Sequence, residues 1–214
     1  MPPKAVPAMH AQSPRRADEA HPVVPLAAPL AAEAVRLLVA GVWVPVPSRA
    51  APLRLREFLE GTLGLDPAYV RERVQTILCD GLAVDDLDAP LPANARMGLS
   101  AALPGVLGAT LRRGGAYAPM RRDITLMPAS AGAPVSAASA PTAPFWVQVR
   151  YFNVIAAEQS LGLLRRGVAA RAGDLGPQLC LLSRQLAMPL PPDLPPLPCA
   201  DLLWLRIHPN GEHS

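Results

Sequence analysis

The 214-residue sequence is half hydrophobic and carries 20 basic against 17 acidic side chains, which gives a formal net charge of +3. This charge is too small to indicate nucleic-acid binding by itself. The 27 prolines and 15 glycines interrupt almost every long segment and exclude an unbroken helical bundle or coiled coil. Because Phe, Trp and Tyr occur three times each, we expect a core built mainly from Leu, Val and Ala.

Residues that commonly carry catalysis or bind metals are few and scattered. The cysteines, Cys79, Cys180 and Cys199, form no CxxC pair and so indicate neither a zinc site nor a redox motif. An oxidising compartment would permit a Cys180–Cys199 disulfide, whereas reduced thiols fit the remaining features better. The four histidines all lie in the terminal segments: His10, His21, His208 and His213. We therefore expect no cofactor and no metal, and we favour a protein without enzymatic activity.

The N-terminal segment gives no indication of export or membrane insertion. It has no continuous apolar stretch of the kind found in signal peptides. The longest apolar stretch, residues 23–47, is interrupted by three prolines, Glu33 and Arg36. A membrane-spanning helix needs about 20 mostly apolar residues. The sequence therefore predicts a cytoplasmic protein that does not contact a membrane.

Three stretches rich in proline and small residues divide the chain. Residues 1–32 are expected to form a disordered leader, residues 126–144 a Pro/Ala/Ser-rich linker, and residues 188–198 an extended proline-rich segment. Two structured parts remain, residues 34–125 and the smaller block 145–214, which contains the proline-rich segment. Whether the two parts form one domain stays open at this point.

The first part is predicted to alternate strands with short helices. Apolar spacing at Leu55, Phe58 and Leu59 indicates a helix that Gly61 and Gly64 end. Asp66 and Pro67 are typical of the start of another helix. The expected strands are a pair or bent strand at 34–47, two short strands around a tight Asp80–Gly81 turn, and a strand at 95–103 ended by Pro104 and Gly105.

The second part is predicted to contain strands and helices in turn. The segment FWVQVRYF, residues 145–152, has a high β-propensity and little charge, so it must be buried or paired. We expect it to be covered by a partner element, with a homodimer as one way to supply the cover. A helix closed by Gly167, a helix from about Pro177 and a last strand at 201–209 are expected to follow.

The element order of residues 34–105 resembles a ubiquitin-like β-grasp fold, and its second half resembles the sulfur carriers of molybdopterin and thiamine biosynthesis. The matching positions are Ile77, Leu78, Asp80, Gly81, Val84, Leu91, Met97, Leu99 and Pro104. The resemblance implies an α+β fold with a β-grasp-like first domain at 34–125. Sulfur carriers end in a free Gly-Gly, whereas this chain continues beyond the pair Gly114–Gly115.

The most concentrated basic segment is the candidate interaction loop. It contains four arginines, two glycines and a tyrosine: Arg112, Arg113, Gly114, Gly115, Tyr117, Arg121 and Arg122. Such a loop suits a protein contact or a grip on a phosphate or RNA backbone. No RNA-binding aromatic pattern accompanies it, so we do not favour nucleic acid as the partner. The glycine pair is interpreted as a turn after Arg113.

Two further features receive local interpretations. The acidic cluster Asp80, Asp85, Asp86 and Asp88 lacks the spacing of a calcium loop and is interpreted as a solvated turn. Cys79, at the end of an apolar strand, is interpreted as a buried packing residue.

Together these observations favour a non-enzymatic protein-interaction or accessory module with an unidentified protein partner. The alternative is a ubiquitin-like or sulfur-carrier-like protein activated by cleavage after Gly115. A weaker alternative is an RNA-contacting protein that uses the arginine loop at 112–122.

Overall fold

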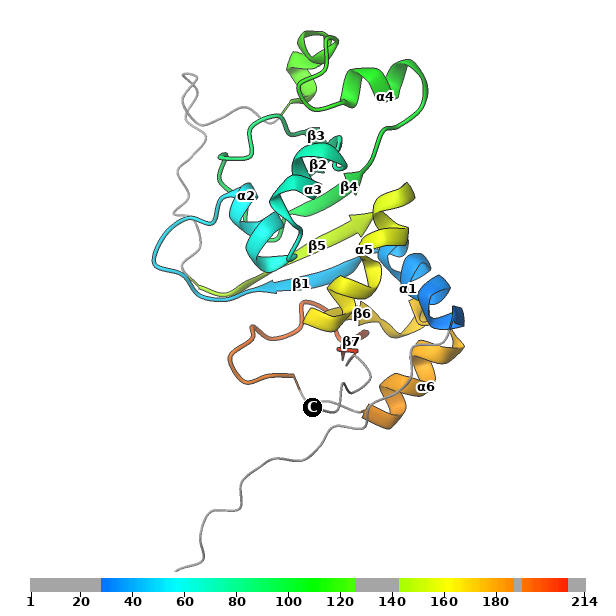
Figure 1. Ribbon diagram of the computed structural model, residues 1–214. Helices are drawn as coiled ribbons and strands as arrows, with labels where there is room; N and C mark the ends of the chain where they lie inside the picture. Colours follow the sequence, from blue (N-terminus) through cyan, green and yellow to red (C-terminus); the bar gives the residue numbers. More distant parts are fainter. Residues whose placement is uncertain (1–27, 126–142, 187–189, 208–214) are drawn as a thin grey trace, which may run out of the picture.

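The computed structural model describes residues 28–125, 143–186 and 190–207, and these form a mixed α/β structure around a seven-stranded mixed sheet (Figure 1). The elements in chain order are α1 (Ala28–Ala40), β1 (Val42–Val46), α2 (Leu55–Glu57), the π-helix η1 (Phe58–Thr62), α3 (Pro67–Glu72), β2 (Thr76–Cys79), β3 (Leu82–Ala83), β4 (Arg96–Ser100), α4 (Gly105–Leu111), the 3-10 helix η2 (Ala118–Ile124), β5 (Phe145–Tyr151), α5 (Asn153–Arg166), β6 (Val168–Arg171), the 3-10 helix η3 (Ala172–Asp174), α6 (Pro177–Leu186) and β7 (Leu202–Leu205).

The strands follow the order β3-β2-β4-β5-β1-β6-β7 across the sheet. Strand β5 pairs in parallel with β4 and antiparallel with β1, while the other neighbouring strands are antiparallel. Strands on both sides of residues 126–144 therefore contribute to one sheet. The α+β class expected from the sequence agrees with this architecture at the level of a mixed sheet with helices packed on it.

Successive side chains of β5 point to opposite faces of the sheet. Val147, Val149 and Tyr151 point into the main core, where they meet buried residues of α1, η1 and α5. Helices α1, α3 and α5 lie on this side of the sheet in Figure 1. Trp146 points to the opposite face and joins a smaller apolar cluster. The expectation that residues 145–152 form a strand buried in a sheet is confirmed, and elements of the same chain supply the cover.

A smaller apolar cluster covers part of the opposite face. Side chains of the predicted proline-rich segment pack there against three tryptophans; the cluster contains Trp43, Trp146, Ala169, Leu190, Leu194, Leu197, Leu202 and Trp204. The indole N–H of Trp146 donates to the Pro196 carbonyl at 2.8 Å. This loop covers the part of the face formed by β1, β6, β7 and the Trp146 end of β5, because these strands supply its contacts.

Several local expectations are confirmed. Asp80 and Gly81 both have positive φ angles, of 51° and 85°, and join β2 to β3 in a tight turn. The carboxylate of Asp66 accepts the backbone N–H groups of Ala68 and Tyr69, and Pro67 opens α3. Gly167 follows α5 with φ at 99°, where the indole of Trp204 lies too close to admit a Cβ. Helix α6 begins at Pro177, as expected.

The strand expected at 34–47 is corrected in its first half. Residues 28–40 form helix α1, and β1 begins at Val42 after Gly41, whose φ is 114°. Leu30, Ala34 and Leu37 recur at helical spacing and are buried against α5 and α6. Five of the thirteen residues of α1 are alanine and three are leucine, which are strong helix formers, so local propensity and the spacing of the buried residues favour the same helix. The helix also includes 28–32, which composition places in the leader.

A buried carboxylate on α1 fixes the start of α6. Glu33 accepts the backbone N–H of Gln178 at 3.1 Å on Oε1 and that of Leu179 at 2.9 Å on Oε2. It therefore caps the first turn of a helix far away in the sequence, where the helix dipole favours a negative charge. A Cβ at Gly176 would lie 2.3 Å from the Glu33 carboxyl carbon, so glycine leaves the necessary space.

We expect Glu33→Ala to lower the free energy of unfolding by about 1 to 3 kcal/mol, because two buried N–H groups lose their acceptor. Urea denaturation followed by circular dichroism measures this loss. Glu72→Ala is the matched control, since the Glu72 side chain is exposed on α3 and should change stability by less than about 0.5 kcal/mol. Equal effects of the two substitutions would contradict the capping role.

Candidate interaction site

The arginine loop predicted from the sequence lies in a projection formed by residues 101–125. Helix α4 and η2 make up this projection, which stands at the upper end of the molecule in Figure 1, away from α1 and α6. Helix α4 folds back closely on the segment before it, because a Cβ at Gly108 would lie 1.8 Å from the Leu103 carbonyl oxygen. Thr125 bridges to Ala83 of β3 and returns the chain to the sheet.

Arg121 links the segments of the projection through its side-chain hydrogen bonds. Its Nη2 donates to Asp85 Oδ1 at 2.7 Å, and its Nε donates to the Thr110 carbonyl at 2.5 Å. Further donations reach the Arg112 carbonyl and Thr125 Oγ1. The side chain is 2% exposed. A buried guanidinium needs a charge partner and acceptors for its N–H groups, and here the loop and Asp85 supply them. Arg121 thus holds the projection in place and is not presented to a partner.

Arg113 joins the projection to α3 and to the residue that precedes β2. Its Nη2 donates to the Val70 carbonyl at 2.8 Å, and its backbone N–H donates to the Gln75 carbonyl at 2.7 Å. Burial lowers the pKa of the Arg113 guanidinium, and the nearby positive charge of Arg56 lowers it further. Its Nη1 is buried without a hydrogen-bond partner among the described residues.

The glycine pair forms a turn, as the sequence indicates. Gly114 has φ at 63°, and its N–H donates to Asp85 Oδ1 at 3.1 Å. The Gly115 N–H donates to the Arg112 carbonyl at 3.1 Å. Asp85 Oδ1 therefore receives both the Gly114 amide and the Arg121 guanidinium, which makes this carboxylate the acceptor that organises the turn.

The other members of the acidic cluster also have local partners. Asp88 pairs with Arg56 Nε at 3.2 Å, Asp86 accepts the Asp88 N–H, and Asp80 accepts the Arg96 N–H at 2.9 Å. Within the described residues no group of three or more His, Cys, Asp or Glu could hold a metal ion. These contacts support the interpretation of the cluster as turn residues.

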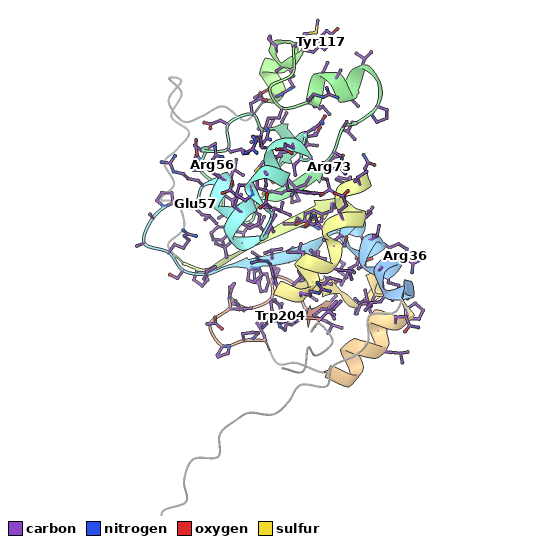
Figure 2. The ribbon with its side chains drawn as sticks, in the orientation of Figure 1. Arg36, Arg56, Glu57, Arg73, Tyr117 and Trp204 are labelled. Carbon is purple, nitrogen blue, oxygen red and sulfur yellow. The ribbon has the colours of Figure 1, made fainter. Side chains whose placement is uncertain are left out.

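What the projection exposes is mainly apolar. Four of the eight large exposed hydrophobic side chains in the described part of the chain lie on it: Val106, Leu107, Tyr117 and Met120. Val106 is 82% exposed and Met120 77% exposed. Tyr117 lies at the outer end of the molecule in Figure 2. We call these four residues the apolar face. Exposed apolar side chains gathered on one small part of a fold are a feature of contact surfaces.

Sequence reasoning located the segment but missed most of the apolar face. Of the predicted loop residues, Tyr117, Arg112 and Gly114 are exposed, Arg113 and Gly115 are half-buried, and Arg121 is buried. Arg122 lies in η2, and its side chain is outside the described residues. Val106 and Leu107 are not identified from the sequence. Pro104 and Gly105 are interpreted there only as the end of a strand, whereas they also mark the start of a short helix.

A concavity of about 490 Å³ lies between α3 and the projection. Its charged lining residues are Arg56, Glu60, Arg71, Asp85, Asp86 and Arg113. Three positive and three negative side chains balance one another there, so the lining favours neither anions nor cations.

Cys79 is buried at the end of β2, as expected. Burial raises the pKa of the Cys79 thiol to about 12, and the charge of Asp80 acts in the same direction. The thiol therefore stays protonated at neutral pH and behaves as a packing group. No disulfide joins Cys180 and Cys199. The four histidines and Lys4 lie outside the described residues.

No protein-family model, curated protein or solved structure matches this chain. Across residues 28–125, 143–186 and 190–207, no helix combines the length and apolar character needed to cross a membrane.

We expect Arg121→Met to lower the free energy of unfolding by about 2 to 3 kcal/mol and to make the projection sensitive to protease. The substitution removes the guanidinium that donates to the Thr110 carbonyl and Thr125 Oγ1. It also removes the charge that balances Asp85, which keeps only the Gly114 N–H as a donor among the described residues. Urea denaturation and limited proteolysis measure the two effects. Arg112→Met is the matched control, because Arg112 is exposed and should remain within about 0.5 kcal/mol of the wild type.

We expect the exposed Cys199 to react quickly with a thiol reagent at pH 9, while Cys79 reacts at the rate of unfolding. The ordinary thiol pKa of 9.0 is raised to about 12 at Cys79, so raising the pH to 9 produces almost no thiolate there. Mass mapping of labelled peptides over time measures both rates. Rapid labelling of Cys79 in the folded protein would contradict its burial.

Proposed function

We propose that this protein is a non-enzymatic interaction or accessory module that binds a protein partner through the apolar face. The observation that carries the proposal is that the projection turns two of its arginines inward and exposes its apolar side chains. Arg121 and Arg113 direct their guanidinium groups inward, whereas Val106, Leu107 and Met120 point outward. Apolar side chains exposed to water do not stabilise the fold, and their burial against a partner lowers the free energy of the complex.

The partner surface that fits best combines apolar side chains with an acidic rim. Arg112 is exposed and lies in the turn that connects α4 with η2. A cation at the edge of an apolar contact adds specificity and speeds association with an acidic partner more than it adds affinity. We therefore expect apolar anchors to provide most of the binding free energy.

The RNA-contacting alternative has less support than the protein contact. Electrostatic binding to an RNA backbone requires exposed cations. Arg121 is almost fully buried, and Arg113 is bonded to the Val70 carbonyl. Their positive charge thus serves the projection itself, and an RNA role for residues 112–122 stays a prediction.

Activation by cleavage after Gly115 also stays a prediction. The Gly114–Gly115 turn is partly accessible, which favours cleavage. However, β5 follows the cut in sequence and lies between β4 and β1. The fragment ending at Gly115 would have to keep its sheet closed without a covalent link to β5. Intact-mass analysis of the native protein distinguishes a species ending at Gly115 from the full chain.

We propose in addition that residues 34–125 take a β-grasp-like arrangement, whose sheet is completed by β5 from the second part of the chain. The support is a mixed sheet with helices on one face and a parallel pair, β4 and β5, near its middle. The element order departs from the expected one at its first position, where helix α1 precedes a single strand.

We expect the double substitution Val106→Asp/Leu107→Asp to abolish partner capture by the full-length protein. Two charges in the apolar face remove the surface that the partner buries, while both positions are exposed and tolerate polar groups. A photo-crosslinking residue placed at position 117 is used in host extract, and mass spectrometry of the crosslinked products identifies the partner. The same measurement on the double variant shows whether capture of that partner is lost.

Val39→Asp is the matched control, because Val39 is an exposed apolar residue on α1, away from the projection. The control should keep full capture, and circular dichroism should show that both variants remain folded. Crosslinks that persist in the double variant would contradict the proposal. Crosslinks that disappear after ribonuclease treatment would instead support the RNA-contacting alternative.

A further inference from the structure

The face of the sheet opposite the helices carries a second open feature. The loop at 190–200 covers this face over β1, β6, β7 and the Trp146 end of β5, whereas a concavity of about 380 Å³ lies over β2, β4 and the part of β5 that contains Gln148 and Arg150. We call it the β2–β5 groove. Its lining residues are Leu78, Asp80, Gly81, Arg96, Met97, Gly98, Gln148, Arg150 and Phe152. The groove is separate from the apolar face of the projection.

The floor of the groove is apolar and shaped by a glycine. Gly98 stands in the middle of β4, paired with Leu78 of β2. A Cβ at Gly98 would lie 3.2 Å from Cε2 of Phe152, so the phenyl ring rests directly on the strand. A glycine within a strand commonly marks a place where another group approaches the backbone closely. Leu78 and Phe152 therefore offer an apolar surface that a flat organic group can contact.

Hydrogen-bond donors stand at the side of this floor. Strands β4 and β5 are in parallel register, which places Arg96 beside Gln148 and Gly98 beside Arg150. The side chains of Gln148 and Arg150 make no hydrogen bond or ion pair with any other residue that the structure describes. Because Gly41 has no Cβ, its backbone leaves room for the Arg150 and Gln148 side chains, which would lie 3.1 Å and 3.2 Å from such an atom.

The charges of the groove favour an anion with a single negative charge. Arg96 and Arg150 contribute two positive charges, and Asp80 contributes one negative charge. Asp80 is held at the hairpin by the Arg96 N–H, and its carboxylate lies 4.0 Å from Arg96 Nε. A carboxylate matches the remaining charge and the planar fork of a guanidinium, whereas a doubly charged phosphate would meet the repulsion of Asp80.

We propose that the β2–β5 groove binds a small organic monocarboxylate. The guanidinium of Arg150 donates to the carboxylate, and the amide N–H groups of Gln148 donate beside it. The apolar body of the ligand packs against Phe152 and Leu78. Arg96 lies at the rim, where it attracts the anion, and the volume of the groove is suited to a ligand of this size.

The test is a titration of the ¹⁵N-labelled full-length chain with benzoate, which combines one carboxylate with a flat apolar ring. We expect saturable shifts at the backbone amides of Gly98, Gln148, Arg150 and Phe152, with a dissociation constant in the millimolar range. Benzyl alcohol, which keeps the ring and lacks the charge, should bind at least about tenfold more weakly. Inorganic phosphate should bind more weakly than benzoate.

Arg150→Gln should weaken benzoate binding about tenfold. Gly98→Val should abolish benzoate binding, because the valine side chain would fill the floor of the groove. If the Gly98→Val variant fails to fold, the affinity of Arg150→Gln for benzoate decides the test. Arg71→Gln, an exposed arginine on α3, is the matched control and should bind as the wild type does. The proposal would be overturned by the absence of saturable shifts at the groove amides, by equal affinities of Arg150→Gln and the wild type for benzoate, or by tighter binding of phosphate than of benzoate. Groove shifts that vary with protein concentration alone would also overturn it, since a second copy of the chain would then occupy the groove.

Discussion

The pairing of β5 with its two neighbours holds the whole sheet together. Strand β5 joins β4 on one edge and β1 on the other, although these two strands lie far from it in sequence. Its residues fill the main core on one face with Val147 and Val149. On the opposite face they supply Trp146 to the smaller cluster and Arg150 to the groove. One seven-residue strand thus fixes the core and positions the residues of the proposed ligand site.

A second constraint is that buried charged side chains need hydrogen-bonding or ion-pair partners within the fold. Arg121 meets it with Asp85 and loop carbonyls, and Glu33 meets it with the first N–H groups of α6. In both places a charged side chain joins segments distant in sequence. Because such pairs are expensive to break, they specify one arrangement of the projection and one position of α6. The surface left to a partner at the projection is then apolar, even though the segment is the most basic of the chain.

The sequence identified the segment of the candidate site but not which of its arginines face inward. The turn at Gly114 follows from local chemistry, since glycine adopts its positive φ readily. The inward direction of Arg121 depends on Asp85, which is brought beside it by the hairpin and by the path of the chain through Thr125. The groove was not foreseen, because its lining comes from β2, β4 and β5, and their order across the sheet has no local signal in the sequence.

The sequence by itself determined the elements whose signals act over a few residues. These include the Asp80–Gly81 hairpin, the Asp66 cap, the end of α5 at Gly167 and the strand character of residues 145–151. The helix at residues 28–40 also has a local signal that the strand prediction overlooked, namely its alanine and leucine content and the helical spacing of Leu30, Ala34 and Leu37. Only the tertiary structure decided that this helix packs against α5 and α6, and which arginines face inward. Burial and long-range pairing are properties of the folded chain, so no window of the sequence carries them.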